Sequence, residues 1–327
     1  MSSYTDPNGN LIASFQVLAD TNREKKDIFR ARAYDNAIIR IKQIQKQLGG
    51  PITTIAQVPL GNGIGKASRD KIKQYLSTGK IEQADKLLAC KPKPKPKSPK
   101  QQTIETFTSV WNIANANAKK LYDSGMRSID DLRRNTHLLT RDQLIGLKFY
   151  EQLQKPIPRR EITQMKYVIM VILAHTFGDD SFKLEVAGSY RRGSKQSGDM
   201  DCLLTSDTFT LQQAVRVLFD WGVIVDGTGM GATEKFMGVA HCPSAGKDQG
   251  VFRIDIVFLP KDEWGSGLLY FTGSQSYVIK VRARAKREGY ILNQHGLFKK
   301  DGLRVPVYTE EEIVNKLGLK YIPPTDR

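Results

Sequence analysis

Apolar residues recur at helical spacing through the first half of the chain. The spacing predicts one long helix over 21–48, which the Gly-Gly-Pro run at 49–51 ends. A glycine-rich turn at 60–65 then opens a second, basic helix that runs to about residue 77. Residues 101–155 return to helical spacing. The first half of the chain is therefore expected to be all helical.

The pattern changes its period in the second half. One long helix is predicted over 161–177, and further helices are predicted at 211–221 and 276–288. Short β-like apolar runs lie before and between them, at 184–186, 200–204, 223–225, 236–239 and 252–259. The fold class is therefore α+β, with a helical N-terminal part followed by a part that mixes helices and a sheet.

A low-complexity segment separates two parts of the chain. Residues 91–100 read Lys-Pro-Lys-Pro-Lys-Pro-Lys-Ser-Pro-Lys, which predicts an extended, positively charged linker. A solvated linker is favoured here over a DNA contact or a nuclear address. The expected division is a basic helical domain, the linker, a second helical subdomain, a catalytic domain and a C-terminal subdomain, at 1–90, 91–100, 101–157, 158–262 and 263–327.

Charge and composition narrow the function. The 327 residues carry a net charge of +16, and residues 1–100 hold 19 basic against 8 acidic side chains. Such a surplus favours a polyanionic partner, held above all by the first third of the chain. We expect no membrane span, no secretory signal and no Cys- or His-based metal site, and therefore an intracellular protein.

Three aspartates are the strongest chemical signal. Asp199 and Asp201 alternate with the apolar Met200, so both should face one side of a strand while Met200 faces the core. Asp255 lies in another apolar run. If the two strands pair, three carboxylates meet, and their repulsion raises their pKa values unless cations lie among them. Oxygen ligands suit Mg²⁺ or Mn²⁺, and two such ions can clamp a phosphoryl transfer.

The neighbouring sequence supports this interpretation over a solvated strand end, which is the ordinary role of an isolated Asp-x-Asp pair. Gly188 and Ser189 suit a turn whose amides and hydroxyl hold a triphosphate. Arg159 and Arg192 could neutralise its oxygens. The sequence thus predicts a site for metal-assisted transfer of a nucleotide.

These motifs and the segments 234–239, 253–256, 268–274 and 318–324 resemble, in the same order, family X DNA polymerases of the beta and lambda types. The resemblance implies fingers, palm and thumb, with a nucleotidyltransferase-type antiparallel-sheet palm. It implies that two divalent ions are held by Asp199, Asp201 and Asp255. The groups implied to hold a dNTP are Arg159, Ser189, Arg192, Ser197, Gly198, Tyr270, Phe271 and Gly273. The groups implied to contact DNA here are Lys235, Arg253 and Arg282.

The chain departs from the family pattern at several positions. Val278 stands where the family has an Asn that reads the incoming base, and Gln275 replaces an Asp. The second of two helix-hairpin-helix motifs reads Asn112-Ile113-Ala114 in place of Gly-x-Gly. Because alanine disfavours a left-handed backbone, weaker gripping of the primer strand is expected at this hairpin.

The N-terminal third carries a second candidate chemistry. Lys71 follows the first hairpin among other basic residues, and a lysine crowded by cations is a better nucleophile. Such an amine can form a Schiff base with an abasic sugar. The alternative is one solvated lysine on a basic helix. The resemblance implies that Lys71 is the lyase lysine, and that DNA is contacted by Arg30, Tyr34, Gly63, Gly65 and Lys66. Departures from the family here are Phe29, Ala67 and Asp70.

We therefore predict a template-directed gap-filling DNA polymerase of base excision repair with 5′-deoxyribose-phosphate lyase activity. It would act as a monomer on gapped or nicked double-stranded DNA with dNTPs, alongside other repair proteins. Its setting would be the nucleus or a viral or organellar replication site. A monovalent cation is expected at the two hairpin motifs. The alternatives are a template-independent terminal nucleotidyltransferase, an RNA-tailing enzyme and a DNA-end binding repair scaffold.

Overall fold

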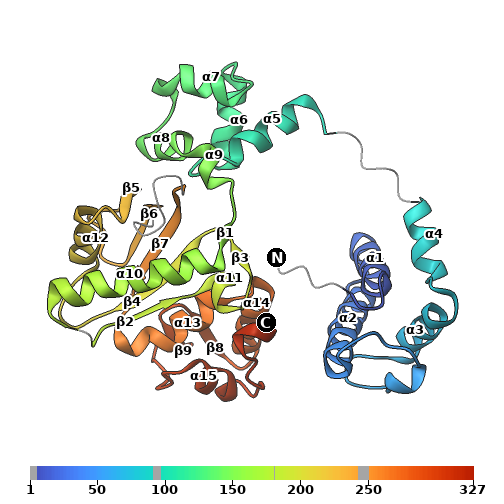
Figure 1. Ribbon diagram of the computed structural model, residues 1–327. Helices are drawn as coiled ribbons and strands as arrows, with labels where there is room; N and C mark the ends of the chain where they lie inside the picture. Colours follow the sequence, from blue (N-terminus) through green and yellow to red (C-terminus); the bar gives the residue numbers. More distant parts are fainter. Residues whose placement is uncertain (1–5, 91–96, 180, 242–249) are drawn as a thin grey trace. The chain divides into compact units, whose positions relative to one another are not determined.

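The chain divides into two compact units, Ser3–Lys97 and Ser98–Arg327, each of which is described by itself (Figure 1). The computed structural model describes residues 6–90, 97–179, 181–241 and 250–327. Residues 91–96 of the predicted linker lie outside this description. No helix within the described parts is long and apolar enough to cross a membrane.

The first unit is helical. Its elements are α1 (Leu11–Glu24), α2 (Ile28–Leu48), the 3₁₀ turn η1 (Ile55–Gln57), α3 (Lys66–Thr78) and α4 (Glu82–Cys90). Their apolar sides share one core, which includes Phe15, Ile41 and Ile72. The prediction of one helix over 21–48 is wrong. Lys26 takes a left-handed φ of 61°, and the Asp27 side chain accepts a hydrogen bond from the first turn of α2.

The second unit begins with the helical fingers. Ser98 caps the first fingers helix, which starts at Pro99, so the predicted linker ends two residues earlier than expected. The fingers elements are α5 (Pro99–Thr108), α6 (Asn115–Asp123), α7 (Ile129–Arg134), η2 (Thr136–Leu138), α8 (Arg141–Lys148) and α9 (Tyr150–Leu153). They pack around a core that includes Phe107, Leu121 and Leu132.

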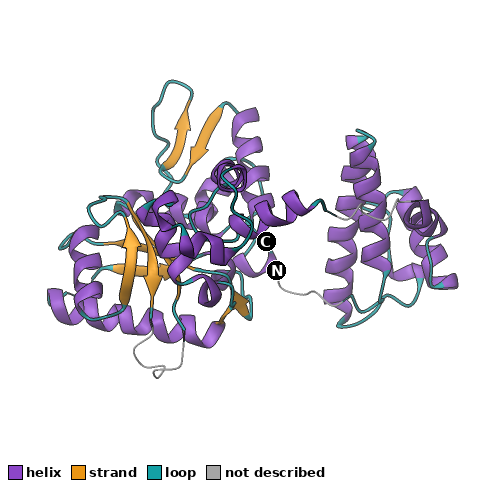
Figure 2. Ribbon diagram, turned by 90° about the horizontal axis from the view of Figure 1, so that it is seen from above, coloured by secondary structure: helices purple, strands orange, loops and turns teal. Residues whose placement is uncertain are grey.

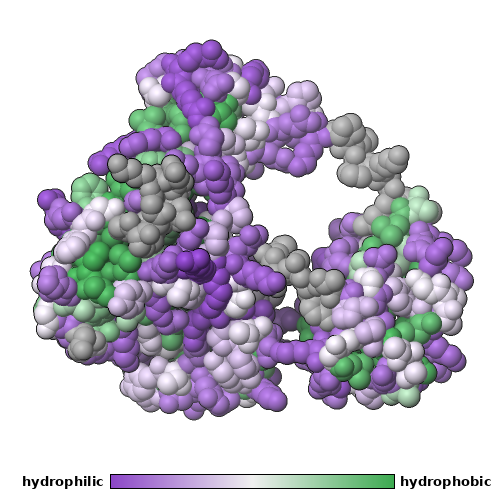
Figure 3. Space-filling model, viewed as in Figure 1, coloured by the Kyte–Doolittle hydropathy of each residue, from purple (hydrophilic) through white to green (hydrophobic). Residues whose placement is uncertain are grey.

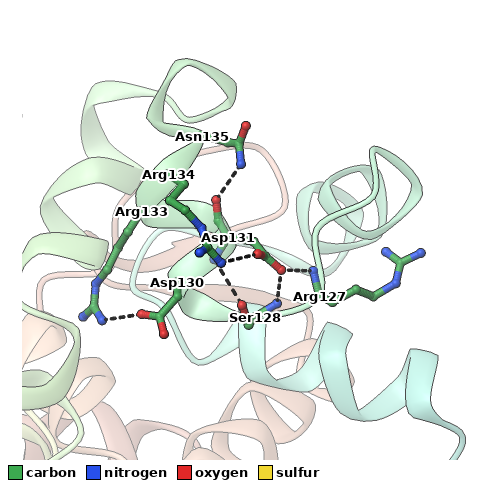
Figure 4. A network of polar contacts seen from close by, with 7 residues as sticks. All are labelled: Arg127, Ser128, Asp130, Asp131, Arg133, Arg134 and Asn135. Atoms are coloured by element: carbon green, nitrogen blue, oxygen red, sulfur yellow. Dashed lines mark hydrogen bonds and ion pairs between the residues drawn. The ribbon is translucent and has the colours of Figure 1, made fainter.

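A capping network fixes the start of α7 (Figure 4). The Asp131 carboxylate accepts hydrogen bonds at 3.0 Å from the backbone N–H groups of Arg127 and Ser128, and one at 2.9 Å from Arg134. Ser128 Oγ in turn accepts from the N–H of Asp131. These donors hold the pKa of Asp131 below its usual range. The turn between α6 and α7 is therefore fixed by polar contacts as well as by Met126 and Ile129, which pack on the fingers core.

The palm is built on a five-stranded sheet in the order β2-β4-β7-β6-β5. Its strands are β2 (Lys183–Val186), β4 (Met200–Thr205), β5 (Ile224–Thr228), β6 (Lys235–Ala240) and β7 (Phe252–Phe258). Three pairings are antiparallel, as expected, but β4 and β7 run parallel. The expectation of an antiparallel sheet is wrong for this pair, because the chain crosses over through a helix and two strands before β7.

Helices cover both faces of the sheet. Alternate residues of β4 and β7, such as Met200 and Ile254, pack against the long α10 (Arg159–Phe177) and α12 (Leu211–Asp220). Residues on the opposite face, such as Leu203 and Val257, pack against α13 (Trp264–Thr272). Figure 2 shows α10 running along one side of the sheet. The palm is therefore a three-layer arrangement.

The surface of the palm is not uniform. Figure 3 shows a mostly hydrophilic face, with hydrophobic residues gathered on the palm around α12 and the adjoining part of α10. Met170, Val171 and Phe219 are exposed there. These residues lie on the outer sides of two helices whose inner sides form the palm core.

The thumb follows the sheet. It contains α14 (Gln275–Arg287), the hairpin of β8 (Tyr290–Asn293) and β9 (Gly296–Lys299), α15 (Glu310–Lys316) and the turns η4 (Lys261–Glu263) and η5 (Pro324–Asp326). Its core includes Val281, Leu297 and Ile313. Two short elements complete the palm: the small sheet of β1 (Ile157–Pro158) with β3 (Gln196–Ser197), and α11 (Gly188–Arg191).

Candidate active site

Asp201 and Asp255 are brought together by the parallel pair of strands. They are register partners across β4 and β7, and each lies one position after a residue that faces the palm core. Their side chains therefore stand side by side on the face that α13 covers. Met200 is fully buried on the opposite face, as predicted. The pairing of these two strands, which the sequence prediction required, is present.

Asp199 lies beside this pair but not on the strand. It occupies the bend that precedes β4, whereas the sequence predicted a position on the strand itself. Its carboxylate forms an ion pair with Arg253, whose Nε lies 3.9 Å from Asp255 Oδ1. Lys235 on β6 lies 3.1 Å from the other oxygen of Asp255. The positively charged side chains of Arg253 and Lys235 thus lie among the three carboxylates.

Asp201 is the acid of the three whose pKa is raised. Burial, with the negative charges of Asp199 and Asp255, raises its pKa to about 7, although Arg253 lowers it in part. The carboxylate also abuts Gly188, where an added Cβ would lie 2.3 Å from Asp201 Oδ2. Gly188 has a φ of 54°, so both its backbone conformation and the close carboxylate require glycine there.

The donor set fits divalent cations by its chemistry. Asp255 Oδ1 is buried and accepts no hydrogen bond from any residue that the structure describes. The pKa of Asp201, raised by the charges of Asp199 and Asp255, is a second sign that the negative charge here is not fully compensated. As the side chains lie, Asp199 turns to Arg253, and no three acidic, His or Cys side chains of the described residues form a complete ligand set. The carboxylates are therefore close together, but they are not arranged as a complete set of metal ligands.

The raised pKa of Asp201 has a consequence for stability. Because the folded pKa lies above the usual value of 3.8, ionising Asp201 costs folding free energy, about 1.4 kcal/mol per pKa unit. This cost is absent below pH 4 and complete above about pH 7. In chelator, we expect Asp201→Asn to raise the unfolding temperature at pH 8 more than at pH 5. Asp226→Asn on β5 is the control, and an equal rise at both pH values would contradict the prediction.

The triphosphate candidates surround α11. Ser189 Oγ donates to Ser197 Oγ at 2.7 Å, which ties the Gly-Ser turn to β3. Arg159 stacks on the Tyr190 ring and donates to the Tyr190 carbonyl at 2.5 Å. Arg192 donates to the Thr272 carbonyl at 2.6 Å. The two arginines predicted to bind phosphate are therefore brought to the turn, but their guanidinium groups are bonded to backbone carbonyls.

The segment predicted to flank the nucleotide sugar ends α13. The rings of Tyr270 and Phe271 meet edge to face at 5.1 Å, and Tyr270 is partly exposed while Phe271 packs against the sheet. Gly273 follows with a φ of 71°. An added Cβ there would lie 3.2 Å from Arg192 Nη1. The end of α13, which was predicted to flank the sugar, is thus adjacent to the turn around α11, which was predicted to hold the triphosphate. On α14, Arg282 is exposed, whereas Val278 is partly buried.

The second hairpin faces the catalytic strands. An open pocket of about 500 Å³ lies between its loop, residues 108–114, and the palm residues Gly198 and Arg253. Asn112 takes the left-handed conformation, with a φ of 67°, and Ala114 caps α6 in an extended one. Weaker gripping was expected because alanine disfavours a left-handed backbone, but among residues 112–114 only Asn112 is left-handed. Gly63 and Gly65 of the first hairpin have the matching conformations.

Asn112→Ala should destabilise the protein by about 1 kcal/mol, because alanine tolerates the left-handed region poorly. Asn112→Gly should be nearly neutral. Urea denaturation of the full chain measures both, with Asn115→Ala, in the first turn of α6, as the control. Equal stability of the Ala and Gly variants would show that the backbone at residue 112 is not what fixes this hairpin.

The lyase candidates lie in the first unit. Lys71 on α3 is half-buried, and its Nζ lies 5.9 Å from the centre of the Tyr34 ring on α2. Lys66 and Arg30 are exposed, and Arg30 lies 3.4 Å from Asp27. Arg69, which the sequence prediction grouped with Lys71, instead donates to the carbonyls of Val58 and Ile55. Its guanidinium is engaged at the turn η1, although it keeps its positive charge.

Sequence reasoning missed several residues that hold the site. Arg191, Thr272 and Glu310 connect α11 to the thumb, and Tyr190 supports Arg159. The only signal in the sequence was the pair of adjacent arginines at 191 and 192. The partners of Arg191 lie more than 80 positions further along the chain, beyond the reach of any local pattern.

Comparison with known proteins accounts for this architecture. Residues 156–261 match the palm of DNA polymerase beta, residues 267–327 match its thumb, and residues 105–154 match the fingers domain of DNA polymerase lambda. Fingers, palm and thumb are thus matched in that order along residues 105–327. The chain belongs to family X of the DNA polymerases.

Two curated relatives extend the similarity into the first unit. The chain is 28% identical over 343 residues to "DNA polymerase lambda" of Rattus norvegicus, which covers 99% of the chain and 56% of the relative. It is 28% identical over 348 residues to "DNA polymerase lambda" of Arabidopsis thaliana, with 98% and 62% covered. The chain therefore spans less than two thirds of the length of these relatives.

Proposed function

We propose that this protein is a template-directed DNA polymerase that fills short gaps in double-stranded DNA. The observation that carries the proposal is the register of Asp201 and Asp255 on adjacent parallel strands, with Asp199 beside them. Membership of family X and the names of the curated relatives support it. The reaction joins the α-phosphate of a dNTP to the primer 3′-hydroxyl and releases pyrophosphate.

Asp199, Asp201 and Asp255 would hold two divalent cations, Mg²⁺ with Mn²⁺ as the alternative. When bound, such ions lower the pKa of the primer hydroxyl and neutralise charge on the triphosphate. Arg253 and Lys235 balance the same carboxylates in the protein as described, so both are placed to exchange a carboxylate for DNA phosphate. This exchange would free Asp199 to join the other two acids.

The dNTP would be held by the turn around α11 and by the end of α13. Ser189, Ser197 and Gly198 line the turn, and Arg159 and Arg192 can exchange their carbonyl partners for phosphate oxygens, which form stronger charge-assisted hydrogen bonds. Tyr270, Phe271 and Gly273 would flank the sugar. Crowding against this segment would disfavour a 2′-hydroxyl.

The DNA would be gripped at several points. The pocket between the second hairpin and Arg253 would take the primer strand, and the exposed Arg282 on α14 would contact the template. Gly63, Gly65 and Lys66, where α3 begins, suit a phosphate on the far side of a gap. A monovalent cation at the two hairpins would support these contacts. The charge surplus of the first third of the chain agrees with this division.

A second activity would reside in the first unit. Lys71 Nζ would attack the aldehyde carbon of a ring-opened abasic sugar and, with loss of water, form a Schiff base. β-Elimination would then remove a C2′ proton, form a C2′–C3′ double bond and break the C3′–O3′ bond, releasing the DNA with a 5′-phosphate. Water would hydrolyse the Schiff base and return the free Lys71 amine. Arg30, Tyr34 and Lys66 would hold the 5′-phosphate. We propose that the protein acts as a monomer in base excision repair of nuclear, viral or organellar DNA, alongside other repair proteins.

A one-nucleotide gapped duplex with a labelled primer tests the polymerase. With Mg²⁺, we expect the dNTP that pairs with the template to be added once, and the other three to be added poorly. Equal addition of all four nucleotides, or extension of single strands, would instead indicate a terminal nucleotidyltransferase. Binding to the gap without extension would indicate a repair scaffold. Preference for rNTPs on an RNA end would indicate an RNA-tailing enzyme.

A further inference from the structure

A buried ion network joins the palm to the thumb beside the triphosphate turn. Glu310, the first residue of α15, is 6% exposed and accepts hydrogen bonds from Arg191 at 2.6 Å and from Arg327 at 2.8 Å. The Arg327 side chain is fully buried and lies over the rings of Tyr277 and Tyr321. A buried carboxylate between two arginines is costly to break, because any partner left alone is an unpaired interior charge.

Thr272 is where this network reaches the candidate active site. Arg191 donates to its hydroxyl at 2.8 Å, and Arg192 donates to its carbonyl at 2.6 Å. Thr272 is completely buried and ends α13, directly before Gly273. Arg191, the last residue of α11, and the adjacent Arg192 thus hold Thr272 by its side chain and by its main chain.

The two hydrogen bonds to Thr272 would respond differently if Arg192 bound the triphosphate. Arg192 would then lose its hydrogen bond to the Thr272 carbonyl, whereas the bond from Arg191 to the Thr272 hydroxyl would remain. Arg191 is kept in place by Glu310, and Glu310 by Arg327. The position of Thr272 with a nucleotide bound therefore depends on the charge of Glu310.

We propose that Glu310 is a positioning residue for sugar selection. By holding Arg191 on Thr272, it fixes the end of α13 against the incoming nucleotide and so sets the preference for dNTPs over rNTPs. The inference rests on the proposed function. A segment that excludes a hydroxyl by crowding must resist displacement, since a shift of about 1 Å is enough to change rates by two orders of magnitude. Glu310 itself contacts neither nucleotide nor DNA in this scheme.

Four variants test the proposal on the gapped duplex, with insertion of the matched dNTP and rNTP measured for each. Glu310→Gln removes the charge and keeps the shape. Arg191→Lys keeps a cation for Glu310 but loses the fork that also reaches Thr272. Arg327→Gln removes the outer support. Asp262→Asn is the control, because it breaks the ion pair with Arg304 elsewhere in the chain's C-terminal part.

We expect Glu310→Gln and Arg191→Lys to lower the dNTP-to-rNTP selectivity about tenfold, mainly through a lower KM for the rNTP, with insertion of the dNTP nearly unchanged. Arg327→Gln should show a smaller loss and Asp262→Asn none. An equal loss of dNTP and rNTP insertion, or an unchanged dNTP-to-rNTP ratio in an active enzyme, would overturn this inference and leave the proposed function standing. A wild type that extends no primer would overturn the proposed function, and the inference with it.

Discussion

Asp255→Ala is expected to reduce templated extension of a gapped duplex by roughly 10³-fold, the size of effect typical for loss of one group that stabilises transition-state charge. The substitution removes the acid that is register partner of Asp201, and it leaves Lys235 and Arg253 without their shared carboxylate. Primer extension under single-turnover conditions, with Mg²⁺ and the matched dNTP, measures the loss.

The control for Asp255→Ala is Asp226→Ala on β5. Asp226 belongs to the same sheet, but its ion pair is with Lys148 of the fingers. It should keep most of the extension activity. Sugar release by the first unit should persist in Asp255→Ala, since its candidate residues lie in the other compact unit. Near-normal extension by Asp255→Ala would remove the basis of the proposed polymerase site.

Lys71→Ala is expected to abolish borohydride trapping of the protein on a 5′-deoxyribose phosphate, with sugar release lowered by at least about 10²-fold. The reason is that the covalent intermediate needs a primary amine, and Lys71 is the half-buried lysine that lies against Tyr34. Extension of an intact gapped primer should continue, because the grouped aspartates are untouched.

Lys73→Ala is the matched control for Lys71→Ala. Lys73 lies on the same helix and carries the same charge, but it is exposed. It should trap as well as the wild type and bind DNA slightly less tightly, most clearly in low salt. Equal loss of trapping in both variants would mean that the basic face of α3 binds DNA and supplies no nucleophile.

Much of the fold follows from local patterns. Four of the five palm strands lie within one residue of their predicted bounds, because short apolar runs between turn residues set them, whereas β5 ends three residues beyond its predicted end. The break between α1 and α2 could not be predicted, since Lys26 takes a left-handed backbone without a glycine or proline to signal it. The parallel direction of β4 and β7 was equally hidden, because strand direction depends on the path of the intervening chain.

The candidate site was predictable in its residue types but not in its contacts. The motifs indicate which acids and arginines matter, and the fold groups Asp201 with Asp255. That Arg159 and Arg192 bond to carbonyls, and that Arg253 holds Asp199, depends on side-chain packing between distant elements. The ion network at Glu310 is unpredictable for the same reason. Their roles with DNA and nucleotide remain predictions.

The parallel pairing of β4 with β7 also shapes how this protein can fold and change. Asp199 and Arg253 meet although they are 54 positions apart, so closing a long loop must precede any catalytic geometry. Non-local pairing of this kind slows folding, and the site forms only after the intervening α12, β5 and β6 have been accommodated. Insertions at the loop tips of this excursion are therefore expected to leave Asp201 and Asp255 as register partners.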